Sequence, residues 1–314
     1  MNKILILGGS GFVGGHLCEK LTRLAWRTTV PTRRRVSAQH LWMLPLVDVF
    51  EADIHDEAAL KRLVAGHDAV VNLVGMLHGS EAAFDRVHVQ LPQKLARRCA
   101  AQDVRRVLHL SALGASAGAP SMYQRSKARG EEVLRAADLD LTILRPSVIF
   151  GPEDRFLNLF ARLQRTFPVI PLAGGATRFQ PVWVEDVASA ALTCLQERSR
   201  IGQTYEACGP QVLALRDLVR LAGRLGGRER PVLALPMALG RLQALLMEWG
   251  PGEPLISRDN LDSMKTDNIA TGLLPGLQAL GISPSSVSAI APSYLNTIGL
   301  EDELLTMRRT AGRF

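Results

Sequence analysis

Aromatic residues, paired cysteines and long apolar runs are all scarce in this chain. Aromatics make up only 5% of the residues, and the basic side chains are spread over the whole sequence. Nothing resembles a recognition helix or a base-stacking platform, so we expect no nucleic-acid partner. The apolar start is too short for a membrane span and lacks a basic n-region and a small-residue cleavage site. We therefore expect a cytoplasmic protein.

Cysteine and histidine lack the spacing that redox and metal sites need. The four cysteines, Cys18, Cys99, Cys194 and Cys208, form no C-x-x-C pair and lie among apolar residues. That context is typical of reduced, buried thiols. The seven histidines are scattered along the chain, so we predict no metal site.

The net charge of +7 comes mostly from arginine, which recurs in pairs and in one triplet. A solvated basic surface accounts for most of these residues. Attraction to anionic lipid or to an acidic partner protein is the alternative.

The most informative segment opens the chain. Lys3–Leu7 is a short apolar run typical of a buried parallel strand, and Val13, Leu17 and Leu21 follow at helical spacing. Glycines between them allow a tight turn and a close backbone approach to a pyrophosphate at the helix amino terminus. No Lys-Ser/Thr pair follows, so this is not a P-loop. The candidate cofactor contacts here are Gly8, Ser10, Gly11, Phe12, Val13 and Gly14.

Strand-like and helix-like segments alternate through residue 150, which predicts an α/β fold with a Rossmann, doubly wound parallel sheet. After the first pair, the predicted strands are Arg27–Thr32, Val47–Glu51, Ala69–Leu73, Val104–Leu110 and Leu139–Leu144. The predicted helices between them are Glu57–Val64, Glu81–Ala101 and Tyr123–Ala137.

Beyond Pro146 the chain becomes richer in proline and glycine, which predicts a smaller carboxy-terminal α/β region. We assign residues 1–150 to the dinucleotide-binding domain. Residues 181–199 rejoin it as a strand at Pro181–Val184 and a helix at Val187–Gln196. Residues 151–180 and 200–297 form the smaller region, with helices at Leu213–Leu225 and Pro236–Trp249, and 298–314 form a tail.

The stretch from Pro231 to Trp249 is the most hydrophobic part of the smaller region. Arg241 interrupts it, and Pro236 and Gly240 make it a poor membrane-spanning helix. We expect a buried or groove-forming helix, with a membrane-surface helix as the alternative.

The end of the second strand predicts the choice of cofactor. An acidic residue there selects NAD, whereas arginine accommodates the 2′-phosphate of NADP. Here Arg33 and Arg34 follow Thr32, and no acidic residue occurs between Arg27 and Asp48. Guanidinium and phosphate form strong, often bidentate bonds, so NADP(H) is favoured and NAD(H) is the alternative.

Two further segments follow predicted strands, where ligands bind in such sheets. Asp53 and Ile54 follow the third strand and are placed to flank the adenine. Asn72, Leu73, Val74 and Gly75 follow the fourth and would run along the ribose and pyrophosphate.

Three residues in sequence order suggest carbonyl chemistry. Ser111 ends the fifth strand, and Tyr123 and Lys127 follow as Y-x-x-x-K on one helix face. A tyrosine can donate a proton beside a hydride acceptor if an ammonium group stabilises its phenolate. Lys127 supplies that charge and can hold the nicotinamide ribose, and Ser111 can bond the substrate oxygen. All three are candidate catalytic and cofactor-binding residues; a solvated helix face is the alternative for Tyr123 and Lys127.

These residues resemble the short-chain dehydrogenase/reductase superfamily, in its extended or atypical branch, which includes epimerase/dehydratase-like proteins. Within it the chain is similar to relatives of the respiratory complex I alpha-subcomplex subunit 9. The resemblance spans residues 1 to about 295 and leaves out the tail from Ile298. It rests most specifically on Ser121–Glu131, Arg145–Asn158, Gln180–Val187, Ser257–Asn260 and Pro275–Ile282. It also implies cofactor contacts at Pro146 and Val148.

Two features depart from the resemblance. His88 stands where many extended members carry asparagine, so one contact that orders the backbone is in question. The interval from Ser111 to Tyr123 is short compared with sugar-nucleotide epimerases, which argues against a large sugar-nucleotide substrate. Asp154, within the resembling Arg145–Asn158 segment, is explained equally well as a cap of the following helix.

The resemblance implies a respiratory-chain accessory protein that holds NADPH as a structural ligand. Its partners would be respiratory-chain proteins or the surface of the inner membrane, with peripheral attachment there. The presence of Ser111, Tyr123 and Lys127 favours a second function, an active NADP-dependent oxidoreductase acting on a carbonyl or a quinone-pathway intermediate. A dinucleotide-sensing regulator is the third alternative. Whether the protein is an enzyme therefore stays open at this point.

Overall fold

The computed structural model describes residues 2–250, 252 and 254–296, and the chain divides into two compact units. The first comprises Met1–Ser147, Val184–Cys208 and Ala270–Ser283. The second comprises Val148–Trp183, Gly209–Ile269 and Pro284–Phe314. The predicted tail, 298–314, lies outside the described residues.

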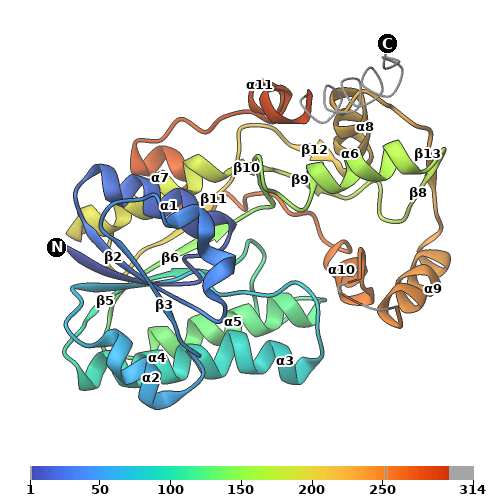
Figure 1. Ribbon diagram of the computed structural model, residues 1–314. Coiled ribbons are helices and arrows are strands. Elements are labelled where there is room, and N and C mark those ends of the chain that lie inside the picture. The colour runs from blue at the N-terminus through green and yellow to red at the C-terminus, as the bar shows by residue number, and fades with distance from the viewer. Residues whose placement is uncertain (1, 251, 253, 297–314) are drawn as a thin grey trace, which may run out of the picture. The chain divides into compact units, whose positions relative to one another are not determined.

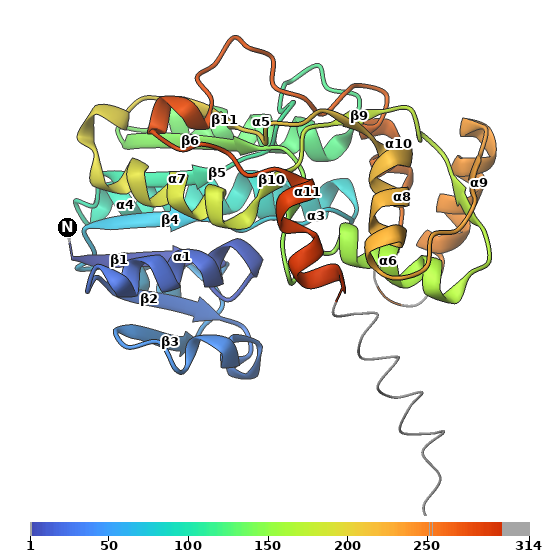
Figure 2. The same ribbon diagram turned by 90° about the horizontal axis from the view of Figure 1, so that it is seen from above.

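A parallel sheet of seven strands forms the centre of the first unit. Its strands are β1 Lys3–Leu7, β2 Arg27–Thr32, β3 Val47–Glu51, β4 Ala69–Asn72, β5 Arg106–Leu110, β6 Asp140–Pro146 and β11 Thr204–Ala207. They lie in the order β11-β6-β5-β4-β1-β2-β3, which Figure 2 shows along the sheet. The order reverses between β1 and β4, and this switch point is where such sheets bind their ligands.

Helices cover both faces of this sheet (Figure 1). α1 Phe12–Arg23 and α7 Val184–Gln196 pack together on one face, and α2 Glu57–Val64, α4 Leu91–Ala101 and α5 Met122–Arg135 cover the other. The core between the second group and the sheet is built from leucine, valine and isoleucine, including Leu5, Val107 and Leu134. Short 3₁₀ segments occur at Arg35–Leu41, Arg198–Arg200 and Leu277–Leu280. The predicted Rossmann α/β fold is confirmed.

The helix predicted over Glu81–Ala101 is interrupted. α3 spans Glu81–Asp85, a π-helical segment follows at Arg86–Gln90, and α4 begins at Leu91. Pro92, in the first turn of α4, has no N–H to donate to the carbonyl of His88 four residues earlier. The regular α-helical bonding therefore breaks at this place, which brings His88 into the candidate site described below.

The second unit holds short elements. Its helices are α6 Leu157–Thr166, α8 Leu215–Leu225, α9 Met237–Glu248, α10 Arg258–Ser263 and α11 Val287–Ile290. Its strand pairs are β7 Ile149–Phe150 with β10 Val182–Trp183, β8 Ile170–Leu172 with β13 Val232–Ala234, and β9 Arg178–Phe179 with β12 Leu213–Ala214. α6 and α8 pack around a core that includes Phe150, Leu157 and Leu218.

One predicted strand is placed wrongly. Pro181–Val184 was expected to return to the central sheet, but Val182 and Trp183 pair with β7 in the second unit. The strand that does join the sheet is β11, beside β6, from a segment assigned to the smaller region. A segment as short as β11, which includes Glu206, gives little hydrophobic signal.

The helix predicted near Pro236–Trp249 forms as α9, but it is not buried. Its buried positions are Gly240 and Ala244, and a Cβ on Gly240 would lie 2.4 Å from the Cβ of Ala173. Small residues thus form the packed stripe, and Leu242 and Leu246 stay 53% and 62% exposed. These two leucines line a shallow, open depression of about 540 Å³, which fits the groove-forming alternative better than the buried one.

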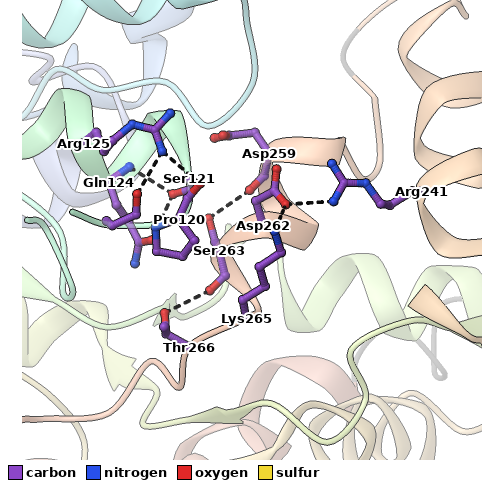
Figure 3. Close-up of polar contacts among 11 residues, drawn as sticks. Pro120, Ser121, Gln124, Arg125, Arg241, Asp259, Asp262, Ser263, Lys265 and Thr266 are labelled. Carbon is purple, nitrogen blue, oxygen red and sulfur yellow. Dashed lines mark hydrogen bonds and ion pairs between the residues drawn. The ribbon is translucent and has the colours of Figure 1, made fainter. Parts of the chain in front are cut away.

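Charged residues beside α9 are paired within the second unit. Arg241 lies 3.2 Å from Asp262, which also pairs with Lys265 at 2.8 Å (Figure 3). Within the described ranges, no helix combines the length and the apolar character needed to cross a membrane.

Candidate functional site

The glycine-rich loop lies at the switch point of the sheet. Gly8 adopts a left-handed conformation, with φ of +82°, and a Cβ there would lie 3.2 Å from the backbone of both Leu73 and Val74. A Cβ on Gly14 would lie 2.5 Å from Gly9. The loop after β1 therefore packs tightly against the segment after β4, and only glycine fits at these two positions.

The loop ends in an uncapped helix amino terminus. Gly11 is the N-cap of α1, makes no side-chain cap hydrogen bond, and is followed by no acidic residue in the first turn. The first N–H groups of α1 are therefore available to an anion, which the helix dipole also favours. Beyond α1 itself, a Cβ on Gly11 would meet only the carbonyl of Gly8, at 3.2 Å. These features fit a pyrophosphate.

Positive charge surrounds the carboxyl ends of β2 and β3. Arg33 and Arg34 are exposed directly after β2, and none of the ion pairs in the described chain involves them. His55 has a lowered pKa because it is partly buried and because Arg86, Lys94 and Arg33 all act on it. Asp53 accepts a hydrogen bond from the backbone N–H of His55 at 2.9 Å. An anionic group would be favoured in this region.

Ser111 and Lys127 come together at the end of β5. The Nζ of Lys127 donates to the carbonyl of Leu110 at 3.1 Å, and a Cβ on Gly75 would lie 3.1 Å from the same nitrogen. Ser111 is buried, and its hydroxyl oxygen has no hydrogen-bond partner among the described residues. A buried hydroxyl without a partner fits a place where a substrate oxygen binds.

α5 holds Tyr123 one turn before Lys127. Ser121 is the N-cap of this helix, and its Oγ accepts from the N–H of Gln124 at 3.1 Å (Figure 3). The ring of Tyr123 packs edge-on against that of His88, with 5.6 Å between centroids. The structure thus assembles the predicted loop, the Leu73–Gly75 segment, Ser111 and the Tyr123–Lys127 pair within one unit.

Burial sets the protonation of the two α5 residues. It raises the pKa of Tyr123 to about 12, so the phenol is neutral at physiological pH. Burial lowers the pKa of Lys127 to about 8, and nearby Glu131 opposes this change. A neutral phenol one turn from a mostly charged ammonium is the arrangement that proton donation to a carbonyl oxygen needs.

His88 orders the backbone at the position where asparagine was expected from the resemblance. Its Nε2 accepts from the N–H of Met76 at 3.2 Å, so the ring proton lies on Nδ1 and donates to Ser126 Oγ at 2.8 Å. Ser126 in turn donates to the carbonyl of Tyr123, also at 2.8 Å. Burial lowers the pKa of His88 to about 2, which keeps the ring neutral. The sequence predictions missed Ser126, although it directly precedes Lys127.

Gly130 was also missed. It faces the π-helical segment, and a Cβ there would lie 2.0 Å from the carbonyl oxygen of His88. The only available signal was a glycine inside a predicted helix, which costs helix stability and needs a packing reason.

Replacing Gly130 with alanine should therefore destabilise the first unit. The added methyl must push the His88 backbone away, and overpacking of this kind costs typically about 1–3 kcal/mol. Urea denaturation measures the loss. Gly118→Ala is the matched control, because a Cβ on Gly118 meets nothing within 4 Å. Equal stability of the two variants would contradict the packing argument.

The remaining predicted residues have other surroundings. Ile54 packs against the core of the first unit. Pro146 ends β6, and its carbonyl accepts from the N–H of Leu113 at 2.9 Å. Val148 belongs to the second unit, where its carbonyl accepts from the N–H of Val182 at 3.0 Å. The cofactor contacts of these three residues stay predictions.

Asp154 caps the start of α6, as the sequence analysis offered as one explanation of this residue. Its carboxylate accepts from the N–H groups of Gly151, Phe156 and Asn158 at 2.8–3.1 Å, at the start of α6. It also accepts from the hydroxyl of Tyr294 at 3.1 Å. The four cysteines are buried and free, as expected.

A family comparison matches the region that carries the site. The family described as "NAD dependent epimerase/dehydratase family" matches residues 4–208. These residues include the whole central sheet except Lys3, the first residue of β1.

Curated relatives are similar over most of the chain. The mitochondrial NADH dehydrogenase (ubiquinone) 1 alpha subcomplex subunit 9 of Mus musculus is 31% identical over 287 residues, covering 89% of this chain and 76% of that protein. A ceramide reductase of Caulobacter vibrioides is 33% identical over 188 residues, covering 59% of this chain and 58% of that protein.

The fold is also found in solved structures. The dTDP-glucose 4,6-dehydratase of Streptomyces venezuelae, crystallised with NAD and TYD bound, superimposes with a TM-score of 0.71. The match covers 93% of this chain and 95% of that one, at 21% identity. The two chains therefore share their architecture. A sequence identity of 21% does not indicate that they share ligands.

Proposed function

The chain belongs to the NAD dependent epimerase/dehydratase family of short-chain dehydrogenase/reductase-like proteins, and we propose that its first unit binds NADP(H). The observation that carries this proposal is the glycine loop. Gly8 has a φ of +82°, a Cβ on Gly14 would clash with the backbone of Gly9, and the N-terminus of α1 beyond Gly11 has no side-chain cap. A pyrophosphate fits this cradle.

Further residues are placed to hold the rest of the dinucleotide. Leu73 and Val74 lie against the loop at Gly8, and Gly75 lies next to the ammonium of Lys127. We propose that Asp53 lies at the adenine end and that Lys127 binds the nicotinamide ribose. When bound, the nicotinamide ring supplies or accepts a hydride.

The preference for NADP(H) over NAD(H) is supported by charge. Arg33 and Arg34 stand after β2 in place of an acidic residue, and Arg86 and Lys94 add positive charge nearby. A 2′-phosphate would be attracted there, whereas the 2′-hydroxyl of NAD would lose the usual carboxylate partner.

We expect NADPH to bind at least tenfold more tightly than NADH, a difference of about 1.4 kcal/mol or more. The double substitution Arg33→Ala with Arg34→Ala should remove most of that difference. Calorimetric titration of both cofactors measures it. Arg62→Ala with Arg97→Ala, on helices α2 and α4, is a control that removes the same charge elsewhere. Equal affinity of the wild-type protein for both cofactors would contradict the proposal that positive charge after β2 selects NADP(H).

The biological role that we propose is that of a respiratory-chain accessory protein. The support is the similarity to curated complex I subunits over most of the chain. In this role NADP(H) stays bound as a structural ligand, respiratory-chain proteins are the partners, and any attachment to the inner membrane is peripheral.

An active oxidoreductase is the second candidate function, and the geometry of one turn of α5 favours it. Tyr123 is neutral, Lys127 keeps an ammonium close to it, and the buried hydroxyl of Ser111 lacks a protein partner within the described chain. In this function Ser111 binds the substrate carbonyl, Tyr123 donates the proton, and Lys127 stabilises the phenolate that remains.

A further inference from the structure

A pair of buried polar side chains lies beneath the candidate site. Asn72 on β4 and His109 on β5 are partners in register, and both are buried. Their side chains contact each other, with 3.2 Å between Asn72 Nδ2 and His109 Nδ1. Asn72 opens the segment that the sequence places along the cofactor, whereas His109 belongs to no predicted site.

The hydrogen bonds fix where the proton of His109 lies. The N–H of Val74 donates to Asn72 Oδ1 at 3.2 Å, so the amide presents its NH₂ group to the ring. His109 Nδ1 therefore accepts. Burial lowers the pKa of His109 to about 3, so the neutral ring carries a single proton, on Nε2.

That N–H group has no acceptor in the described protein. His109 Nε2 is buried and without a hydrogen-bond partner, as is the hydroxyl of Ser111, which directly follows β5. Lys127 donates to the carbonyl of Leu110, the residue between them, and the described chain gives its ammonium no second acceptor. Buried donors without acceptors are rare and indicate an ordered water or a ligand atom.

We propose that one buried water molecule accepts hydrogen bonds from His109 Nε2 and from Lys127 Nζ, which makes His109 a positioning residue for Lys127. A water oxygen has two lone pairs and can serve both donors. The role of Lys127 toward the cofactor rests on the proposed function, but the water site does not.

The consequence concerns the charge of Lys127. A water oxygen favours the protonated ammonium and opposes the effect of burial. The other titratable groups facing Lys127 are Tyr123 and Glu131 on α5 and His88 on the π-helical segment. Glu131 is itself held by Arg145 from β6 at 2.6 Å, and the two histidines are neutral.

The test follows the titration of Lys127 by NMR in full-length protein labelled with ¹³C at the lysine Cε, without added cofactor. Lys127→Ala identifies the signal. The wild-type signal should titrate near pH 8. In His109→Phe, which removes the donor, it should titrate about one pH unit lower. His109→Gln keeps an N–H donor and should restore the wild-type value.

His67→Phe is the matched control, because His67 is likewise buried with one ring nitrogen bonded, to Thr29 at 2.8 Å, and the other without a partner, but it lies before β4. It should leave the titration unchanged. A His109→Phe protein whose Lys127 titrates at the wild-type pH would overturn the proposal.

A second measurement does not depend on the folding of any variant. A crystal structure of the wild-type protein at high resolution should show a water within hydrogen-bond distance of both nitrogens. A dry site would overturn the proposal, and it would leave dinucleotide binding, which titration with NADPH tests separately, unaffected.

Discussion

Replacing Gly11 with valine should abolish dinucleotide binding while the protein still folds. Gly11 has a φ of −88°, which valine can adopt, and a Cβ there meets only the carbonyl of Gly8. The loss of folding stability should therefore be small, about 1 kcal/mol for a poor N-cap residue. The branched side chain would occupy the space over the uncapped N-terminus of α1, where the pyrophosphate is expected.

The expected loss of NADPH affinity is on the order of 100-fold or more, about 2.7 kcal/mol. Calorimetric titration measures the affinity, and circular dichroism with thermal unfolding checks the fold. Gly118→Val is the control, since its side chain meets open space in the same unit. A folded Gly11→Val protein that binds NADPH like the wild type would show that the loop is only a structural turn.

Tyr123→Phe should separate an enzyme from a protein that only holds the cofactor. The substitution removes one hydroxyl group, so NADPH affinity should stay nearly unchanged. If Tyr123 is the general acid, the rate of carbonyl reduction should fall by about 10²–10⁴-fold, the typical contribution of such a group. Lys127→Ala should weaken both binding and turnover, because we assign the ammonium to the ribose and to the phenolate.

The measurement is NADPH oxidation with a series of aldehydes, ketones and quinones. Rapid oxidation by wild-type protein that disappears in Tyr123→Phe would support the oxidoreductase and count against the accessory role. A purely structural cofactor would show no multiple turnover and would stay bound through purification. Turnover that persists unchanged in Tyr123→Phe would exclude Tyr123 as the acid.

The central sheet was predictable because its inner strands have a recognisable apolar sequence pattern. β1 and β4 are almost fully buried and are mostly apolar, so they form short apolar runs between glycine and polar segments. The glycine loop and Y-x-x-x-K then fall at strand ends, and the order of strands brings them together. At this site the local sequence patterns and the strand order therefore lead to the same prediction.

The features that sequence reasoning missed depend on contacts between distant segments. β11 joins the sheet through its pairing with β6 and has little apolar character of its own. The break at His88 needs Pro92 and also Gly130, which lies on a different helix. The sequence left α9 as either a buried or a groove-forming helix, because hydrophobicity alone does not tell which stripe of a helix packs.

The central claim is that this chain is an NADP(H)-binding protein. The most direct test is to purify it, unfold it, and identify the released small molecules by mass spectrometry, with NADPH titration of the protein freed of ligand. We expect NADP(H) to copurify or, after its removal, to rebind more tightly than NADH. Release of NAD(H) alone, or a ligand-free protein that binds neither cofactor, would contradict the account.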